Sequence, residues 1–334
     1  MFYSTSHSRT ARVLGAIATA VGCFTTVGSA VAQDGEYPTR PITLVIPFSP
    51  GGSADTLGRI LAEKMAVKLG QSVVVENKAG AGTTVASSYV ARAKPDGYTL
   101  YIGMMNLHGM DKVLYPGITY DGIKDFSHIN QLITFPMVVV ARTESPYNTF
   151  SDVVNHAKGK PDAISHASAG VGSSNHVAAV QFMKVAGVKL LNVPFKGGNP
   201  AAVATVAGDV DISFATPPTA MPMIKAGRLK ALGLTADKPS PLFPGIPSAP
   251  EAGLPGYNFL VWHGLYGPAG IDKQVQEKLF KVTSEILADP EVQAKLHDLG
   301  MQEAPSKSIE EFNEFVRKVA DDTAELARAA KDDQ

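Results

Sequence analysis

Strand-length apolar runs alternate with amphipathic, helix-length runs along most of this chain. The apolar run at residues 42–48 is followed by apolar residues at helical spacing that end before Gly70, and the same alternation repeats as far as residue 235. Parallel strands need a crossover of about a dozen or more residues between them, usually a helix. The alternation therefore predicts an α/β fold with mostly parallel sheets that helices cover on both faces.

The expected elements can be placed along the sequence. We expect strands at residues 42–48, 73–76, 98–103, 137–141, 163–168, 190–193, 210–215, 229–235 and 257–266. We expect helices at residues 57–69, 83–94, 151–158, 175–186, 200–207 and 219–226, and through the chain after the last strand. Residues 236–256 hold six prolines and three glycines and are expected to form a loop.

The length of the chain favours two lobes over one. The chain has 334 residues, of which 45% are apolar and 18% charged, as in a globular protein. We expect it to cross between lobes near residues 135–137 and again near residues 257–261, so that one lobe is inserted into the other. The prediction assigns residues 33–137 and 257–334 to lobe 1 and residues 138–256 to lobe 2.

The first 32 residues are expected to be a secretory signal peptide rather than part of the fold. Arg9 and Arg12 precede an uncharged run at residues 13–27, and Ala-Val-Ala at residues 30–32 offers a cleavage site. The single cysteine, Cys23, lies in this segment, so the exported chain is expected to carry no thiol or disulfide. The alternative is a lipoprotein with its anchor at Cys23, since the residues before it resemble a lipoprotein box.

The charged and metal-binding residue types exclude several classes of partner. The formal net charge is −1 and the basic residues are scattered, unlike the basic patches that bind nucleic acids or anionic membranes. The histidines beyond the signal peptide form neither H-x-x-x-H nor H-E-x-x-H. We therefore expect no metal site, no cofactor and no nucleic-acid partner.

The loop at residues 50–55, Pro-Gly-Gly-Ser-Ala-Asp, joins the first expected strand to a helix. Ligands of open α/β sheets bind beyond the carboxyl ends of strands, where such loops lie. The loop lacks the motifs of a phosphate loop, a dinucleotide site and a hydrolase nucleophile elbow. Glycines, a serine and exposed N–H groups at a helix N-terminus suit a small anion. The alternative is that Ser53 or Asp55 only caps the helix.

A second loop, Ser-Ala-Gly-Val-Gly-Ser-Ser-Asn at residues 168–175, has the same character. If the lobes face each other, two donor-rich helix ends point into one cleft and can hold a carboxylate. Residues 104–108, 196–199 and 215–218 follow other expected strands and are further candidates. Met104 and Met105 could pack on the apolar body of a ligand, and core packing is the alternative for both.

Several segments, in order along the chain, carry a family resemblance. They read YPTRPITLVIPFSPGGSADTLGRILAEKM, VVVENKAGAG, ARAKPDGYTLYIG, SAGVGSSNHVAAVQF, NVPFKGGNPA, VAGDVDISFATPPTA, IKAGRLKALGLT and EAGLPGY. These segments resemble the Bug family, the periplasmic substrate-binding proteins of tripartite tricarboxylate transporters. The resemblance implies a two-lobed periplasmic binding protein of the type II, flytrap kind, each lobe a mostly parallel or mixed sheet flanked by helices. It also implies a periplasmic location, a small organic acid as ligand and two integral membrane subunits as partners, and we expect a monomer.

The resemblance also points to the ligand-binding loops, which match residues 48–55 and 168–176. Together with the other strand-end loops, the candidate ligand contacts are Phe48, Pro50, Gly51, Gly52, Ser53, Ala54, Asp55, Met105, Asn106, Ala169, Gly170, Gly172, Ser173, Ser174, His176 and Thr216. Family members commonly read F-D-N-L-P where residues 214–218 read Phe-Ala-Thr-Pro-Pro, so a counter-charge for a ligand ammonium is missing. This departure predicts a dicarboxylate or an aromatic carboxylate rather than an amino acid.

Two other functions are alternatives to a binding protein. An exported hydrolase would use Ser53 or Ser173 as nucleophile, but the sequence shows no base paired with either serine. An exported sensor would present its liganded form to a membrane sensor kinase. We expect a binding protein with no catalytic residues.

Overall fold

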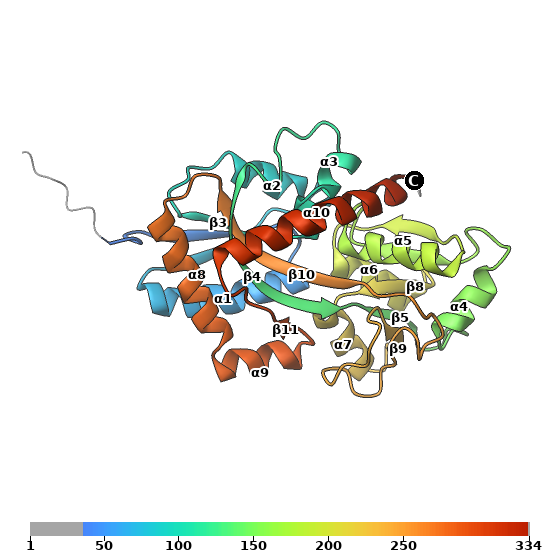
Figure 1. Ribbon diagram of the computed structural model, residues 1–334. Helices are drawn as coiled ribbons and strands as arrows, with labels where there is room; N and C mark the ends of the chain where they lie inside the picture. Colours follow the sequence, from blue (N-terminus) through green and yellow to red (C-terminus); the bar gives the residue numbers. More distant parts are fainter. Residues whose placement is uncertain (1–35, 333–334) are drawn as a thin grey trace, which may run out of the picture. The chain divides into compact units, whose positions relative to one another are not determined.

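Two β-sheets organise residues 36–332, the part of the chain that the computed structural model describes (Figure 1). The first sheet contains β1 (Ile42–Ile46), β2 (Val73–Asn77), β3 (Thr99–Met104), β4 (Phe126–Pro136), β10 (Leu260–Pro268) and β11 (Gln302–Glu303). The second contains β5 (Val138–Arg142), β6 (Ser165–Ser168), β7 (Leu191–Pro194), β8 (Ile212–Ala215) and β9 (Leu229–Leu234). The expected signal peptide and Cys23 lie outside the described residues.

Helices flank both sheets and complete a two-lobed α/β fold. The helices that follow strands of the first sheet are α1 (Ser53–Leu69), α2 (Thr84–Ala91), α3 (Met110–Leu114), α8 (Lys273–Leu287), α9 (Pro290–Asp298) and α10 (Ile309–Asp332), with the 3-10 turns η1 (Ala81–Thr83) and η2 (Met105–Leu107). Those of the second lobe are α4 (Phe150–Ala157), α5 (Ser174–Ala186), α6 (Gly198–Ala207) and α7 (Pro217–Lys225).

Both sheets are mixed, although the alternation of runs predicted mostly parallel ones. The order is β11-β4-β10-β3-β1-β2 in the first sheet and β7-β6-β8-β5-β9 in the second. Strand β1 is parallel to β2 and β3, whereas β10 is antiparallel to β3 and β4. In the second sheet β5 is antiparallel to both of its neighbours. The antiparallel strands β5 and β10 directly follow the two places where the chain changes sheet.

Among the elements of residues 36–332, strand β4, of 11 residues, is the one long element that the sequence pattern did not predict. Polar side chains interrupt its apolar residues, yet most of its positions are buried. Ser127 donates to the Pro268 carbonyl oxygen, and Asn130 donates to Thr283 and Ser284. These long-range hydrogen bonds satisfy the buried polar groups, so a strand without an apolar pattern is stable at this place.

Most predicted elements are present with shifted ends. Helix α1 ends at Gly70, whose φ of 67° is left-handed, as the glycine predicted. Helix α7 begins two residues earlier than predicted, at Pro217, because proline fits the first turn of a helix. Residues 235–259 contain no regular helix or strand, in agreement with the proline-rich loop. The helical C-terminal region also contains the short strand β11.

The two connections between the sheets are joined to each other. The chain leaves the first sheet through Met137 and returns to it between β9 and β10. The Met137 amide donates to Thr235 Oγ1 (2.8 Å), and that hydroxyl donates to the Phe259 carbonyl oxygen (2.6 Å). From residue 37 onward the described residues pack as one compact unit, so the division into lobe 1 and lobe 2 at residues 137–138 and 256–257 stays a prediction.

Helix α10 also links the two lobes. It crosses beside the first sheet and extends toward α5 (Figure 1). Its Glu325 forms an ion pair with Lys184 of α5 at 3.0 Å. Both side chains are exposed, and an exposed ion pair contributes little free energy. The packing of α10 on α3, α5 and β4 therefore outweighs this ion pair in holding the helix in place.

The buried histidines give a testable pH dependence. Burial, and to a smaller degree the neighbouring His176, lower the pKa of His166 from 6.5 to about 3. Above pH 6.5 this histidine is neutral in both the folded and the unfolded state, and the fold keeps its full stability. As the pH falls below 6.5, the unfolded state takes up a proton that the folded state does not, so the free energy of unfolding decreases. Between pH 6.5 and pH 5 the loss is about 2 kcal/mol, or a few degrees in melting temperature.

A variant separates His166 from the other buried titratable groups. Burial raises the pKa of Asp111 to about 7, and that group acts in the opposite direction. The melting temperature of wild-type protein is therefore expected to fall more steeply between pH 7 and pH 5 than that of His166→Phe. Parallel curves for the two proteins would contradict the prediction.

Candidate functional site

A small cavity lies between the two lobes, at the carboxyl ends of strands from both sheets. Its volume is about 30 Å³, which is room for about one or two water molecules. It is lined by Phe48, Ser49, Gly52, Ser53, Ala54, Met104, Ala169, Ser174, Asn175, Gly198 and Thr216. Because these residues come from both lobes and leave so little space, an organic ligand needs the lobes to separate before it can reach the cavity.

The N-terminal ends of four helices meet at this cavity. Ser53, Ser174 and Gly198 are the first residues of α1, α5 and α6, and Thr216 is the N-cap of α7. The N-cap residues of α1 and α6 are the glycines Gly52 and Gly197, and Thr216 at the N-cap of α7 makes no capping hydrogen bond with its side chain. Free N–H groups and the positive ends of helix dipoles favour an anion at this place.

None of the described residues that line the cavity is charged. The donors available to an anion are therefore backbone N–H groups and hydroxyl groups rather than an arginine or lysine side chain. Such donors bind a carboxylate through several charge-assisted hydrogen bonds of about 1.5–3 kcal/mol each. The site has no acidic side chain that would pair with a ligand ammonium group.

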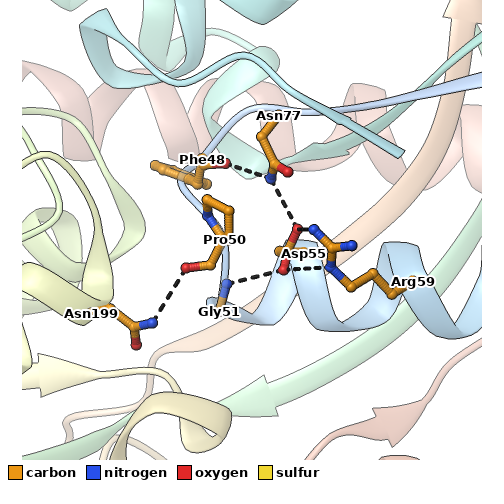
Figure 2. A network of polar contacts seen from close by, with 7 residues as sticks. All are labelled: Phe48, Pro50, Gly51, Asp55, Arg59, Asn77 and Asn199. Carbon is orange, nitrogen blue, oxygen red and sulfur yellow. Dashed lines mark hydrogen bonds and ion pairs between the residues drawn. The ribbon is translucent and has the colours of Figure 1, made fainter. Parts of the chain in front are cut away.

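Asp55 holds the first binding loop in place (Figure 2). Its carboxylate accepts hydrogen bonds from the Gly51 amide, the Arg59 guanidinium and the Asn77 side chain, at 2.9–3.0 Å. Asn77 also donates to the Phe48 carbonyl oxygen at 2.8 Å. Burial alone would raise the pKa of Asp55, but these hydrogen bonds lower it below its usual range. The Asp55 carboxylate is thus occupied by the protein itself.

Direct hydrogen bonds between the lobes close the edges of the cavity. On one side Ser49 Oγ donates to the Lys196 carbonyl oxygen (3.0 Å), and Asn199 donates to the Pro50 carbonyl oxygen (3.3 Å; Figure 2). On the other, Tyr115 Oη donates to the Val171 carbonyl oxygen at 2.9 Å. The described structure is therefore a closed arrangement of the two lobes.

The candidate contacts named from the sequence divide into two groups. The cavity brings together Phe48, Gly52, Ser53, Ala54, Ala169, Ser174 and Thr216. Outside its lining are Pro50, Gly51, Asp55, Met105, Asn106, Gly170, Gly172, Ser173 and His176. The assignment of both groups to ligand binding stays a prediction.

The residues outside the lining have structural contacts of their own. Asn106 donates a hydrogen bond to the Gly172 carbonyl oxygen, and the Gly172 amide donates to His176 Nδ1 (3.1 Å). Ser173 caps α5 by accepting a hydrogen bond from the His176 amide. Met105 is buried in the core, which agrees with core packing, the alternative given for this residue. These residues determine the shape of the two binding loops without lining the cavity.

The structure adds residues that the candidate list did not contain. Ser49, Asn175 and Gly198 line the cavity, and each lies in a loop or helix start that directly follows a strand. All three lie in strand-end loops that were already candidates from the sequence, at residues 48–55, 168–175 and 196–199. His263 lies on β10, and its Nε2 is 2.9 Å from Ser53 Oγ. No local sequence signal indicates this pair, because 210 positions separate the two residues.

The described residues offer neither a metal-binding cluster nor a membrane-spanning helix. No group of three or more His, Cys, Asp and Glu side chains within residues 36–332 is placed to hold a metal ion. Among the described helices, none is both long enough and apolar enough to cross a membrane.

Comparison with known families decides the class of protein. The model of the tripartite tricarboxylate transporter family receptor, TctC, matches residues 57–329. The chain belongs to this receptor family. TctC receptors are periplasmic substrate-binding proteins and not enzymes, so the prediction of a binding protein rather than an enzyme is confirmed at the level of the family.

Relatives of this TctC receptor agree with the resemblance to the Bug family. The UPF0065 protein in the tcbD-tcbE intergenic region of Pseudomonas sp. (strain P51) is 37% identical over 294 residues, which cover 88% of this chain and 86% of the relative. The solved structure of the periplasmic binding protein BugD is 34% identical, with a TM-score of 0.81, and covers 88% of this chain and 98% of its own.

Two similar structures contain a ligand. MatC from Rhodopseudomonas palustris with bound malate is 33% identical, with a TM-score of 0.81 over 87% of this chain and 100% of MatC. An R. palustris protein with adipate is 28% identical, with a TM-score of 0.83 over 88% of this chain and 98% of its own. Both ligands are dicarboxylates.

Proposed function

We propose that this chain captures a small carboxylate in the interlobe cavity and delivers it to a tripartite tricarboxylate transporter. The observation that carries the proposal is the meeting of four helix N-termini at a cavity without charged side chains. Each helix end favours an anion by about 0.3–1 kcal/mol, and the N–H groups can bind carboxylate oxygens directly. Malate and adipate in two related structures support the same ligand class.

We further propose that the ligand is a dicarboxylate or an aromatic carboxylate rather than an amino acid. An ammonium group in a closed cavity needs a negative partner, because burying an unpaired charge is costly. The lining offers hydroxyl and amide oxygens but no carboxylate, and Asp55 is already engaged by Arg59 and Asn77. Phe48 and Met104 supply apolar surface for the body of the ligand.

The remaining parts of the proposal concern location and partners. The protein would be exported by the signal peptide at residues 1–32, and lipid anchoring at Cys23 is the alternative. In the periplasm it would act as a monomer and hand its ligand to two integral membrane subunits. The transporter in the description of the matching family supports these partners.

A thermal-shift panel tests the ligand class. At 100 times its dissociation constant a ligand stabilises the folded state by about 2.7 kcal/mol, which raises the melting temperature by several degrees. We expect such a rise with malate, succinate, adipate or an aromatic acid such as phenylacetate, and none with glutamate, leucine or lysine. Stabilisation by amino acids alone would overturn the proposed ligand class.

A further inference from the structure

Ser53 and His263 form a buried pair at the wall of the cavity. Ser53 lines the cavity, and its Oγ lies 2.9 Å from Nε2 of His263, which is fully buried on β10. The other ring nitrogen, Nδ1, lies 3.1 Å from the Trp262 carbonyl oxygen. The ring of Phe135 packs edge-on against the imidazole, with 5.3 Å between ring centres. The imidazole is therefore held in one orientation behind the serine.

The hydrogen-bond partners determine where the protons of this pair lie. A carbonyl oxygen only accepts hydrogen bonds, so Nδ1 of His263 carries a hydrogen. Burial lowers the pKa of His263 to about 4, against the opposing effect of the bond with Trp262, so the ring is neutral at pH 7. Nε2 then has no hydrogen and accepts one from the Ser53 hydroxyl. Toward a ligand, Ser53 Oγ therefore offers only lone pairs and acts as a hydrogen-bond acceptor.

Two other side chains in the lining also have donors that the protein already uses. The Ser49 hydroxyl donates to the Lys196 carbonyl oxygen at 3.0 Å, and the Asn175 amide nitrogen donates to the Phe214 carbonyl oxygen at 2.5 Å. The donors that remain for the carboxylate are the backbone N–H groups at the helix ends and the hydroxyl groups of Ser174 and Thr216. The Ser53 oxygen is a separate acceptor beside them, at the start of α1.

We infer that the ligand carries a hydroxyl group, that this hydroxyl donates a hydrogen bond to Ser53 Oγ, and that His263 is the positioning residue that makes Ser53 an acceptor. The substrate class is then a hydroxycarboxylate, and this refinement rests on the proposed function. An ammonium group could also donate, but the lining has no negative side chain to balance its charge. A carboxylate oxygen facing Ser53 would meet lone pairs and be disfavoured.

Matched pairs of acids test the inference by titration calorimetry on the exported form of the chain. Malate differs from succinate, and mandelate from phenylacetate, by one hydroxyl group. In the pair that binds, we expect the hydroxy acid to bind at least about tenfold more tightly, since its analogue leaves a desolvated acceptor unpaired. Equal affinities within the pair would overturn this inference and leave the proposed function intact.

Variants at position 263 separate positioning from simple packing. His263→Phe keeps an aromatic ring but removes the acceptor, so Ser53 can turn its hydroxyl hydrogen to a carboxylate. The preference for the hydroxy acid is expected to fall below about threefold. His263→Gln offers a side-chain oxygen as acceptor and is expected to restore part of the preference. A role in packing alone would change the melting temperature and leave the ratio of affinities as in wild type.

If His263→Phe fails to fold, Ser53→Ala tests the same inference. This variant removes the acceptor from the cavity wall and is expected to abolish the preference for the hydroxy acid. A preference that survives in Ser53→Ala would overturn the inference. Binding of no acid from either pair, or from the thermal-shift panel, would overturn the proposed function and the inference with it.

Discussion

Replacing Asp55 with alanine is expected to weaken ligand binding at least about tenfold and to destabilise the fold by about 3 kcal/mol, although Asp55 does not line the cavity. The Asp55 carboxylate accepts hydrogen bonds from the Gly51 amide, Arg59 and Asn77 (Figure 2). Hydrogen bonds to a charged group contribute about 1.5–3 kcal/mol each where they are buried. Without the hydrogen bonds to Asp55, the loop before α1 no longer holds its N–H groups where they can donate to the ligand.

Chemical denaturation and titration calorimetry measure the two effects of Asp55→Ala. A loss of about 3 kcal/mol corresponds to about 5 °C in melting temperature for a chain of this length. Arg59→Ala is the matched control, because the Arg59 side chain is 56% exposed and an exposed partner contributes less than about 1 kcal/mol. Asp55 keeps Gly51 and Asn77 in that variant. Asp55→Ala with wild-type stability and affinity would show that the network does not organise the loop.

A methyl group at position 82 is expected to prevent full closure of the lobes and to weaken ligand binding about 10-fold to 100-fold. Gly82 belongs to η1 and has a left-handed φ of 60°. A Cβ at this place would lie 2.7 Å from the Val171 carbonyl oxygen, which belongs to the second binding loop. The same Cβ would lie 2.7 Å from Tyr115 Oη. Because a backbone oxygen cannot move aside as a flexible side chain can, Gly82→Ala is expected to push η1 slightly away from the second binding loop.

Small-angle scattering and calorimetry distinguish this effect from unfolding. Gly82→Ala is expected to keep most of its stability, since a left-handed alanine costs about 1–2 kcal/mol and the cores of the two lobes are untouched. Its radius of gyration with saturating ligand should exceed that of the wild type. Gly117→Ala is the matched control, because a Cβ at Gly117 has no heavy atom within 4 Å. Wild-type affinity in Gly82→Ala would rule out close approach of the loops as a requirement for binding.

The local pattern of the sequence predicted the elements that position the site. The apolar run before the Gly-Gly-Ser corner and the helical spacing after it correspond to β1 and α1. The loop at residues 168–175 likewise joins β6 to α5. Such assignments succeed because a helix or strand depends mainly on residues within a few positions of one another. Strand β4 was missed because its buried polar side chains are satisfied by distant partners.

Several segments resemble a known family and follow one another in the same order along the chain, and this resemblance predicted the class of protein. The match over residues 57–329 confirms it. The candidate contacts were harder to assign. Both loops reach the cavity, but sequence could not separate residues that line it, such as Ser53 and Ser174, from those that shape it from behind, such as Asp55 and Ser173. The side chains of neighbouring residues in a tight loop point in different directions, and only the folded backbone decides which of them face the cavity.

By itself the sequence determined the α/β fold class, the two glycine- and serine-rich helix starts and the family of receptors. Tertiary structure alone decided that four helix ends meet, that β5 and β10 run antiparallel to their neighbours, and that the hydroxyl of Ser53 faces the imidazole of His263. The physical reason is distance along the chain. Propensity and periodicity act between near neighbours, whereas a hydrogen bond between residues 210 positions apart exists only once the first sheet has brought the end of β1 close to β10.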